Sequence, residues 1–300
     1  MPQTLLQSQS IFLTAPGGAK LHLKRIFSSR DKPAVLCIHG AFDSGRIFYN
    51  KKLDRGLAPF LAKDFDVFVL DFRGHGESTP PVERNSTFGM YENIREDLPL
   101  AIARIFEEKK QSPVSVVAHS DGGVLFYSSF AFKDGFSGKV PRAVLVGSKR
   151  CISARNIRRF FAIDIAWYLV TPQLLRLFNF LPAKRLKIGS NNDTRAYTEQ
   201  RMPWLKGASW SDPVDSFNYK EALENTNKPR TLFIAASNDP YLGNRKDVQS
   251  FKGEIANSED EFLLASRETG FSQDYSHVSV LTDKRAESEV FPRIKNWLRG

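Results

Sequence analysis

The sequence predicts an α/β protein with a mostly parallel central sheet that is covered by helices on both faces. Short apolar runs recur along the 300 residues, and segments with helical spacing separate most of them. The expected strands occupy residues 34–38, 67–71, 114–118, 143–147, 231–236 and 261–265. Such alternation of strands and helices is typical of a parallel sheet whose crossover helices cover both faces.

The remaining elements complete this pattern at both ends of the chain. Residues 10–27 predict a two-stranded hairpin that turns at residues 15–18, where Ala-Pro-Gly-Gly favours a tight turn. Apolar residues at helical spacing predict helices over 91–109, 123–132 and 286–298, the last of them closing the chain.

One connection is far longer than an ordinary crossover. About 80 residues separate the strands expected at 143–147 and 231–236, whereas most connections in compact domains are a few residues long. Residues 156–181 within this connection are helical in pattern and rich in aromatic side chains. Because Pro172 interrupts the pattern, we expect two helices here.

The net charge of +10 is concentrated in that same connection. Residues 149–188 contain nine basic side chains and a single acidic one, Asp164. A focused basic field favours anionic substrates or anionic lipid surfaces, although a solvated helical face explains it as well. No nucleic-acid-binding motif accompanies the charge, so we expect no nucleic-acid partner.

Composition also bears on the compartment. No run of 18 apolar residues occurs, which predicts no transmembrane helix, and MPQTLLQSQSIF at the start lacks a signal-peptide pattern. Cys37 and Cys151 are far apart in the sequence, and Cys37 falls in an expected buried strand. We therefore expect free thiols and a cytoplasmic protein, with peripheral attachment to membranes through the basic residues as a further hypothesis.

The most informative motif is VVAHSDGG, residues 116–123, in which an apolar run ends in Ser120 and small residues follow at once. This pattern is typical of the sharp strand-to-helix turn G-x-S-x-G, which exposes a nucleophilic serine above a sheet. Ala118 occupies the place of the first glycine, a mild departure, and Gly122 occupies the place of the second.

Other polar motifs follow the ends of other expected strands. His39-Gly40-Ala41 follows residues 34–38, DFRGHGES (71–78) follows the next run, and Asp239 follows 231–236. His277 lies on a late loop before the last helix. Because the carboxyl ends of parallel strands share one edge of the sheet, we expect these motifs to form a single site there.

In this order, the motifs resemble those of the α/β-hydrolase fold superfamily, and most closely its esterase and monoacylglycerol-lipase-like serine hydrolases. The resemblance covers residues 10–298. It implies an α/β-hydrolase core formed by residues 1–148 and 227–300. It also implies that residues 149–226 form a mostly helical cap, or lid, inserted into that core.

The resemblance further implies a catalytic triad of Ser120, His277 and Asp239. A serine hydroxyl needs an adjacent base, and the base needs an orienting acid. His277 is the histidine placed where the fold carries its base, and Asp239 lies on the expected strand-end loop in the family order of serine, acid and histidine. Asp247 and Asp274 are the rival acids.

The oxyanion of an acyl-transfer reaction needs hydrogen-bond donors. By position in the family these are the backbone N–H groups of Asp121 and Ala41, with Phe42 as the alternative to Ala41. We expect the side chain of Asp121 to point away into the helix N-terminus, where the dipole favours a carboxylate. Phe42, His119 and Trp167 are the expected substrate-binding side chains.

These residues predict a serine hydrolase that cleaves a carboxylic ester, with a lipophilic acyl group favoured by the aromatic side chains of the cap. A serine nucleophile argues against epoxide hydrolases and haloalkane dehalogenases, which need a carboxylate there. The sequence shows no metal-ligand cluster and implies no cofactor. Two alternatives remain: hydrolysis of a thioester, amide, lactone or carbon–carbon bond by the same triad, and a non-catalytic binding protein.

Overall fold

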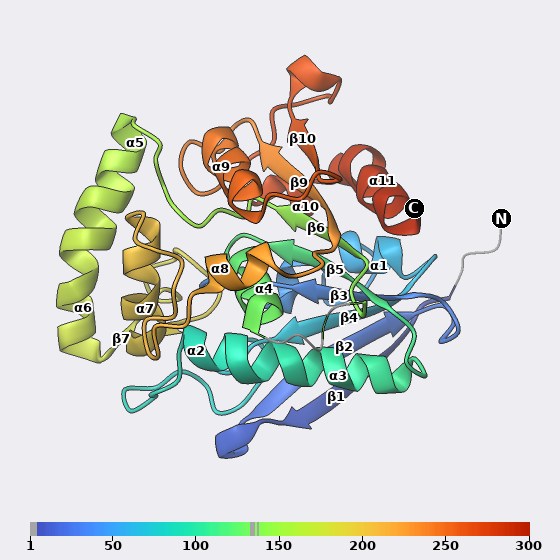
Figure 1. Cartoon of the computed structure of the whole chain (residues 1–300), viewed down its shortest axis with the longest axis horizontal. Helices are drawn as coiled ribbons and strands as arrows, with labels where there is room; N and C mark the ends of the chain where they lie inside the picture. Colours follow the sequence, from blue (N-terminus) through green and yellow to red (C-terminus); the bar gives the residue numbers. More distant parts are fainter. Residues whose placement is uncertain (1–4, 133–135, 137) are drawn as a thin grey trace.

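The computed structural model describes residues 5–132, 136 and 138–300 and is built around an eight-stranded sheet (Figure 1). The strand order is β1-β2-β4-β3-β5-β6-β9-β10. The strands are β1 (Gln7–Thr14), β2 (Lys20–Phe27), β3 (Ala34–Ile38), β4 (Asp66–Asp71), β5 (Val114–His119), β6 (Arg142–Val146), β9 (Arg230–Ala236) and β10 (Glu261–Ala265). β1 and β2 form the antiparallel hairpin at one edge, and the strands from β4 to β10 run parallel. Every strand expected from the sequence is confirmed, to within one residue at most ends.

Helices cover both faces of this sheet. One face carries α2 (Met90–Glu92), the π-helical turn η3 (Asn93–Asp97), α3 (Leu98–Glu108), α4 (Asp121–Phe132), α8 (Tyr219–Glu224) and α9 (Arg245–Ile255). The other carries α1 (Leu57–Leu61), α10 (Ser279–Thr282) and α11 (Ala286–Arg299). Short 3-10 turns lie at Pro16–Gly18, Gly45–Ile47 and Arg267–Thr269. The expected helices 91–109, 123–132 and 286–298 are therefore confirmed with small changes at their ends.

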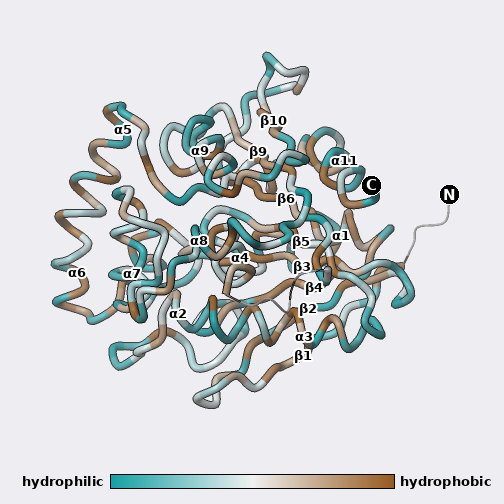
Figure 2. The backbone as a smooth tube through the Cα atoms, in the orientation of Figure 1, coloured by the Kyte–Doolittle hydropathy of each residue, from teal (hydrophilic) through white to brown (hydrophobic). Residues whose placement is uncertain are grey.

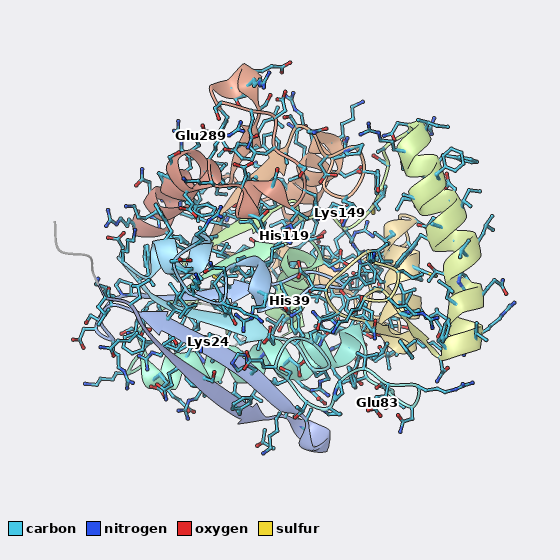
Figure 3. All side chains as sticks on the ribbon, turned by 180° about the vertical axis from the view of Figure 1, so that it is seen from behind. Lys24, His39, Glu83, His119, Lys149 and Glu289 are labelled. Atoms are coloured by element: carbon cyan, nitrogen blue, oxygen red, sulfur yellow. The ribbon has the colours of Figure 1, made fainter. Side chains whose placement is uncertain are left out.

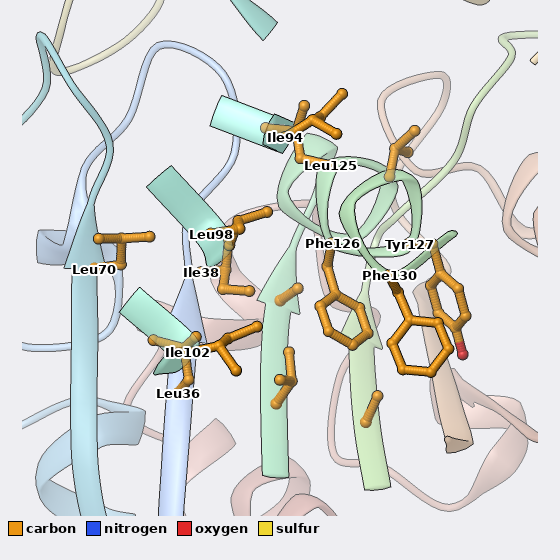
Figure 4. Packing of buried hydrophobic residues seen from close by; sticks show 14 of the residues in the cluster. Leu36, Ile38, Leu70, Ile94, Leu98, Ile102, Leu125, Phe126, Tyr127 and Phe130 are labelled. Carbon is orange, nitrogen blue, oxygen red and sulfur yellow. The ribbon is translucent and has the colours of Figure 1, made fainter. Parts of the chain in front are cut away.

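Side chains of successive strand residues enter two different cores, because neighbouring residues of a strand point to opposite faces. Leu36 and Ile38 of β3 pack under α3 and α4, as Figure 4 shows. Val35 and Cys37 of the same strand pack against α1 and α11. With both faces covered, the parallel strands are almost continuously apolar, which is why they were recognisable in the sequence.

The long connection between β6 and β9, residues 147–229, is called the insertion below. It contains a helical run made of α5 (Ile157–Arg159), the π-helix η5 (Phe160–Val170) and α6 (Thr171–Phe178). The short strands β7 (Phe180–Leu181) and β8 (Asp193–Thr194), then α7 (Arg195–Leu205) and α8, follow. α8 packs on α4 and α9. Figure 1 shows the helical run at the outer edge of the molecule, with α7 between it and the sheet.

The expectation of two helices separated by Pro172 is wrong. Residues Ile157–Phe178 form one continuous helix. Directly before the proline, the backbone N–H of Thr171 bonds to the carbonyl of Ala166, five residues back, and its hydroxyl donates to the same oxygen at 3.1 Å. The wider π-helical turn accommodates Pro172 at the start of a new α-helical segment, where its missing N–H costs little.

The same helix corrects the expectation that no segment could span a membrane. Among the described residues, Ile157–Phe178 is long and apolar enough to do so by length and composition, and only 17% of its most apolar window is buried. Ile157, Phe161 and Leu177 are 69%, 60% and 62% exposed. Figure 2 shows apolar positions along this outer helix, away from the sheet. The helix thus presents an apolar surface that the rest of the described chain does not cover.

Candidate active site

Ser120 occupies the sharp turn between β5 and α4. Its φ of +53° lies in the left-handed region, which a non-glycine residue adopts only where the surroundings enforce it. The backbone N–H of Ser120 donates to the carbonyl of Val146 at 2.8 Å and so ties the turn to β6. A Cβ on Gly122 would lie 2.5 Å from the carbonyl oxygen of His39, so the glycine in the motif is required by the close approach of β3.

The structure brings Ser120, His277 and Asp239 together although they are far apart in the sequence. Nε2 of His277 lies 3.0 Å from Oγ of Ser120, and Nδ1 lies 2.6 Å from Oδ2 of Asp239. The second carboxylate oxygen of Asp239 accepts the backbone N–H of Leu242 at 2.8 Å. Since Nδ1 faces a carboxylate, the proton resides there, and Nε2 is free to accept a proton from the serine.

Asp239 is buried and is held ionised by its neighbours. Burial alone would raise its pKa, but the hydrogen bond and charge of His277 and the positive charge of Lys149 lower it below the usual range. The two rival acids lie elsewhere. Asp274 accepts hydrogen bonds from Ser237, Ser266 and Arg267, and Asp247 accepts two from Ser153.

The position of the His277 ring depends on Gly147, directly after β6. Gly147 has a φ of +63°, and a Cβ there would lie 2.9 Å from the imidazole. Any side chain at this position would therefore displace the ring from Ser120.

The candidate oxyanion donors, Ala41 and Asp121, lie on the two segments that meet at the serine. A Cβ on Gly40 would lie 2.8 Å from Cβ of Ser120 and 3.3 Å from the backbone nitrogen of Asp121. Within the described part of the chain, the backbone N–H groups of Ala41 and Asp121 donate to no protein acceptor. The same holds for Phe42, so the alternative between Ala41 and Phe42 stays open.

A cavity of about 380 Å³ opens above Ser120, a size typical of small-molecule sites. The three side chains expected to bind substrate, those of Phe42, His119 and Trp167, all line it. Phe42 and Trp167 meet edge to face with ring centroids 5.6 Å apart, so the loop after β3 contacts the outer helix of the insertion. Most of the lining is apolar, and the insertion contributes much of it: Ile152, Ile163, Trp167, Ile188, Tyr197 and Leu205.

His119 supports the catalytic histidine candidate rather than acting as a second base. Its Nε2–H donates to the carbonyl of His277 at 3.0 Å, and the two rings pack 4.7 Å apart. Burial, reinforced by the neighbouring His277, lowers the pKa of His119 to about 3. The ring is therefore neutral at ordinary pH.

The side chain of Asp121 does not point into the helix N-terminus as expected. Its two oxygens accept hydrogen bonds from Nε and a terminal nitrogen of Arg201 on α7, at 2.8 and 2.7 Å, and Lys149 approaches to 3.5 Å. The bidentate pair with Arg201 is stronger than a helix dipole, since all three side chains are buried. These charges lower the pKa of Asp121 far below its usual range, against the effect of burial.

Because of this pairing, the free energy of unfolding depends on pH. Because Asp121 has a lower pKa in the folded than in the unfolded chain, its ion pairs stabilise the protein fully above the ordinary aspartate range. The contribution is lost as the pH falls below that range.

Sequence reasoning missed Lys149, Tyr197 and Arg201 as parts of this site. Lys149 was counted only among the basic residues of a presumed surface, yet it is 4% exposed. Its position three residues after β6, at the same sheet edge as Ser120, was the available signal. Tyr197 and Arg201 lie on α7, and nothing in their spacing pointed to the site. Lys149 and His119, which ends β5, are labelled in Figure 3, and both are buried.

Two further histidines from the sequence motifs have structural contacts. Nδ1–H of His39 donates to the carbonyl of Gly40, and its Nε2 accepts the backbone N–H of Phe72. Nε2 of His75 lies 2.8 Å from Asp193 of the insertion. In the described ranges, no three or more His, Cys, Asp or Glu residues are grouped to hold a metal ion, and Cys37 and Cys151 are free.

A serine, a histidine and an aspartate hydrogen-bonded at the carboxyl edge of a largely parallel sheet, under a helical insertion, define the class of α/β-hydrolase-fold proteins. The chain belongs to the α/β hydrolase fold family. The model of that family matches residues 33–194, more than half of the chain and including Ser120.

Solved structures share this fold across almost the whole chain. An esterase of Pyrococcus furiosus has a TM-score of 0.60 at 17% identity, covering 98% of this chain and 92% of its own. An enol-lactonase of Burkholderia xenovorans has a TM-score of 0.57 at 15% identity, covering 97% and 100%. At these identities the likeness concerns the fold, and the two names show that the fold accommodates different substrates.

Curated relatives match over a shorter region. A tear acid lipase-like protein of Mesocricetus auratus is 27% identical over 128 residues, 40% of this chain and 32% of the relative. A serine hydrolase-like protein of Mus musculus is 30% identical over 99 residues, 33% of this chain and 28% of the relative. The chain thus matches about a third of the length of these two relatives.

Proposed function

We propose that this protein is a serine hydrolase that cleaves carboxylic esters with a lipophilic acyl group through an acyl-enzyme. The observation that carries the proposal is the continuous hydrogen-bonded line from Ser120 through His277 to Asp239. Hydrogen-bond contact between these three side chains at a cavity supports the roles of nucleophile, base and orienting acid that we propose for them.

In the proposed mechanism, Oγ of Ser120 attacks the ester carbonyl while Nε2 of His277 takes up the hydroxyl proton. The resulting imidazolium is stabilised by Asp239 and then returns the proton to the leaving alcohol. Water next repeats the sequence on the acyl-enzyme, with His277 again as the base, and releases the carboxylic acid. The backbone N–H groups of Asp121 and Ala41 would hold the negative oxygen in both halves.

The lining of the cavity supports a lipophilic acyl group. Ile163, Trp167, Leu205 and Leu242 present apolar surface, and each buried methylene of a substrate gains about 0.8 kcal/mol by leaving water. A cavity of about 380 Å³ limits the length of acyl chain that fits without movement of the insertion.

The test is turnover of 4-nitrophenyl esters from acetate to palmitate, together with labelling by a fluorophosphonate, which reacts with activated serines. We expect stoichiometric labelling and a kcat/KM that rises with chain length and then falls once the chain exceeds the cavity. The optimum should fall at the chain length that just fills the cavity, since each methylene that fits gains about 0.8 kcal/mol. A protein that neither reacts with the probe nor turns over any ester would instead support a non-catalytic binding role.

We further propose that the helix Ile157–Phe178 docks on anionic lipid surfaces. Apolar side chains are exposed along it, and basic side chains are exposed on and beside it: Arg155, Arg158, Arg176, Lys184, Arg185 and Lys187. The only acid of this region, Asp164, is paired with Arg159. Exposed apolar residues combined with uncompensated positive charge fit an anionic interface. Ile163 and Trp167 of the same helix line the cavity, so docking would bring lipid substrates to its entrance.

Sedimentation with vesicles tests this proposal. The protein should bind phosphatidylcholine vesicles that contain 30% phosphatidylglycerol at low salt, and bind less as salt increases. Reversal of three charges in Arg155→Glu, Arg158→Glu and Arg176→Glu should weaken binding roughly a hundredfold or more, since each basic residue near the surface contributes about 1 kcal/mol.

The control reverses three exposed lysines elsewhere, Lys51→Glu, Lys52→Glu and Lys220→Glu, and so changes the net charge equally. If both triple variants lose binding to the same extent, net charge rather than this helix mediates attachment. Absence of binding at low salt would end the membrane proposal.

A further inference from the structure

Lys149 is the one cation of the cavity wall whose hydrogen bonds are largely unused. Its side chain is buried and lines the cavity beside Ser120. An ammonium group carries three donors. Among the described residues, the only acceptor of Lys149 is Oδ1 of Asp121, at the long distance of 3.5 Å.

That acceptor is already occupied. Arg201 donates to both oxygens of Asp121 at 2.8 and 2.7 Å, and the hydroxyl of Tyr197 lies 3.4 Å from Oδ2. Two further donors of Arg201 bind the backbone carbonyls of Lys149 and Arg150. Arg201 and Asp121 therefore pair with each other, and Lys149 remains with most of its donors unused.

Asp239 attracts Lys149 electrostatically but accepts no hydrogen bond from it. Both of its carboxylate oxygens are bonded, one to His277 and the other to the backbone N–H groups of Tyr241 and Leu242. In the proposed reaction its charge balances the imidazolium that forms on His277. Burial lowers the pKa of Lys149, against the attraction of Asp121, as expected for a cation without a full set of partners.

Another ionisable group of the cavity lining is Asp43, on the loop after β3. Asp43 accepts hydrogen bonds from the backbone N–H of Ser44 and from the hydroxyl of Ser190, both at 2.9 Å. The charges that act most on Asp43 are His75 and Asp71. Those that act most on Lys149 are Asp121, Arg201 and Asp239. Lys149 and Asp43 thus interact with different sets of charges.

We propose that Lys149 binds a carboxylate of the substrate. The esters cleaved here would then carry a carboxylate in the part of the molecule that lies next to Lys149. This inference rests on the proposed ester hydrolysis and narrows its substrate class. An ammonium group with unused donors matches the oxygens of a carboxylate. A carboxylate would supply the missing acceptors and offset the cost of burying the ammonium group. The apolar remainder of the cavity would hold the carbon chain between the carboxylate and the ester.

Two pairs of substrates test the inference, because the carboxylate can belong to the acid or to the alcohol part of the ester. Mono-4-nitrophenyl adipate and its methyl ester differ only in the charge at the far end of the acyl chain. The butyrate esters of 4-hydroxybenzoate and of methyl 4-hydroxybenzoate differ in the same way on the alcohol side. In at least one pair we expect the anionic member to have the higher kcat/KM, through a lower KM, by about tenfold or more.

The ratio of anionic to neutral kcat/KM should fall about tenfold or more in Lys149→Met, and Lys149→Arg should retain part of it. Lys220→Met removes an exposed lysine of α8, outside the cavity, and should keep the wild-type ratio. Melting temperatures and fluorophosphonate labelling identify any variant that fails to fold. Preference for the neutral ester in both pairs, or an unchanged ratio in Lys149→Met, would overturn the carboxylate site.

A binding measurement separates this inference from the proposed function. Calorimetric titration of the protein with hexanoate and with hexanamide needs no turnover. Hexanoate should bind about tenfold or more tightly than the amide, and Lys149→Met should remove that difference. If hexanoate binds through Lys149 but no ester is cleaved and no serine is labelled, the carboxylate site stands and the proposed hydrolase activity fails. If esters are cleaved but hexanoate and hexanamide bind alike, the proposed hydrolase activity stands and the carboxylate site fails.

Discussion

Replacing Ser120 with alanine should reduce kcat for 4-nitrophenyl butyrate by a factor of about 10⁴ or more, because the attacking oxygen is removed. Binding should change little, since only one oxygen leaves a cavity of about 380 Å³. Labelling by the fluorophosphonate should disappear at the same time. The measurement is steady-state kinetics of the two proteins with the labelling reaction run beside them.

A matched control is available on α4. Ser129 is also buried, and its hydroxyl has no hydrogen-bond partner among the described residues. Ser129→Ala should therefore keep full activity and equal or greater stability. The melting temperature of Ser120→Ala should lie close to that of the wild type, because alanine adopts the left-handed turn with strain similar to that of serine. Full activity in a folded Ser120→Ala protein would exclude the proposed nucleophile.

Replacing Asp239 with asparagine should lower kcat by about 10³ to 10⁴, although the two side chains have the same shape. The carboxylate accepts from His277 with one oxygen and from the backbone N–H of Leu242 with the other. Asparagine has a single oxygen. If that oxygen keeps the backbone bond, its NH₂ group faces Nδ1 and drives the imidazole proton to Nε2, where it blocks acceptance of the serine proton.

Asp274→Asn is the comparison for this prediction, since Asp274 was a rival acid in the sequence. Its side chain accepts from Ser237, Ser266 and Arg267 and does not contact His277, so the variant should keep activity within about twofold. Activity near wild type in Asp239→Asn, combined with a large loss in Asp274→Asn, would assign the acid to Asp274 instead. Kinetics of both variants, with circular dichroism to verify folding, decide between the two.

Much of the fold could be predicted because its signals are local. The parallel strands are buried on both faces and therefore stand out as apolar runs such as Ala34–Ile38 and Val114–His119. Topology then required that the motifs after these strands meet at one edge. The structure brings Ser120, Asp239 and His277 together at that edge.

The long-range partners could not be predicted, because charge pairing inside a protein depends on which segments the fold brings together. Asp121 was expected to interact with its own helix, but Arg201, 80 residues later, offers a bidentate partner in a buried site. Predictions of side-chain partners fail most often in the insertion, because its residues pack on core elements that are distant in the sequence. For the same reason, nine basic residues in one region did not reveal that Lys149 faces inward.

The sequence by itself determined the strands and most of the helices, because periodicity and strand ends are properties of short segments, and the resemblance to α/β hydrolases supplied the candidate serine, acid and histidine. Only the tertiary structure decided that Pro172 lies within one continuous helix, that this helix is exposed, and that Lys149 points into the cavity. The continuous helix depends on the π-helical turn before Pro172, and the exposure of the helix and the burial of Lys149 depend on elements distant in the sequence. The residues adjacent to Pro172 or Lys149 do not encode these features.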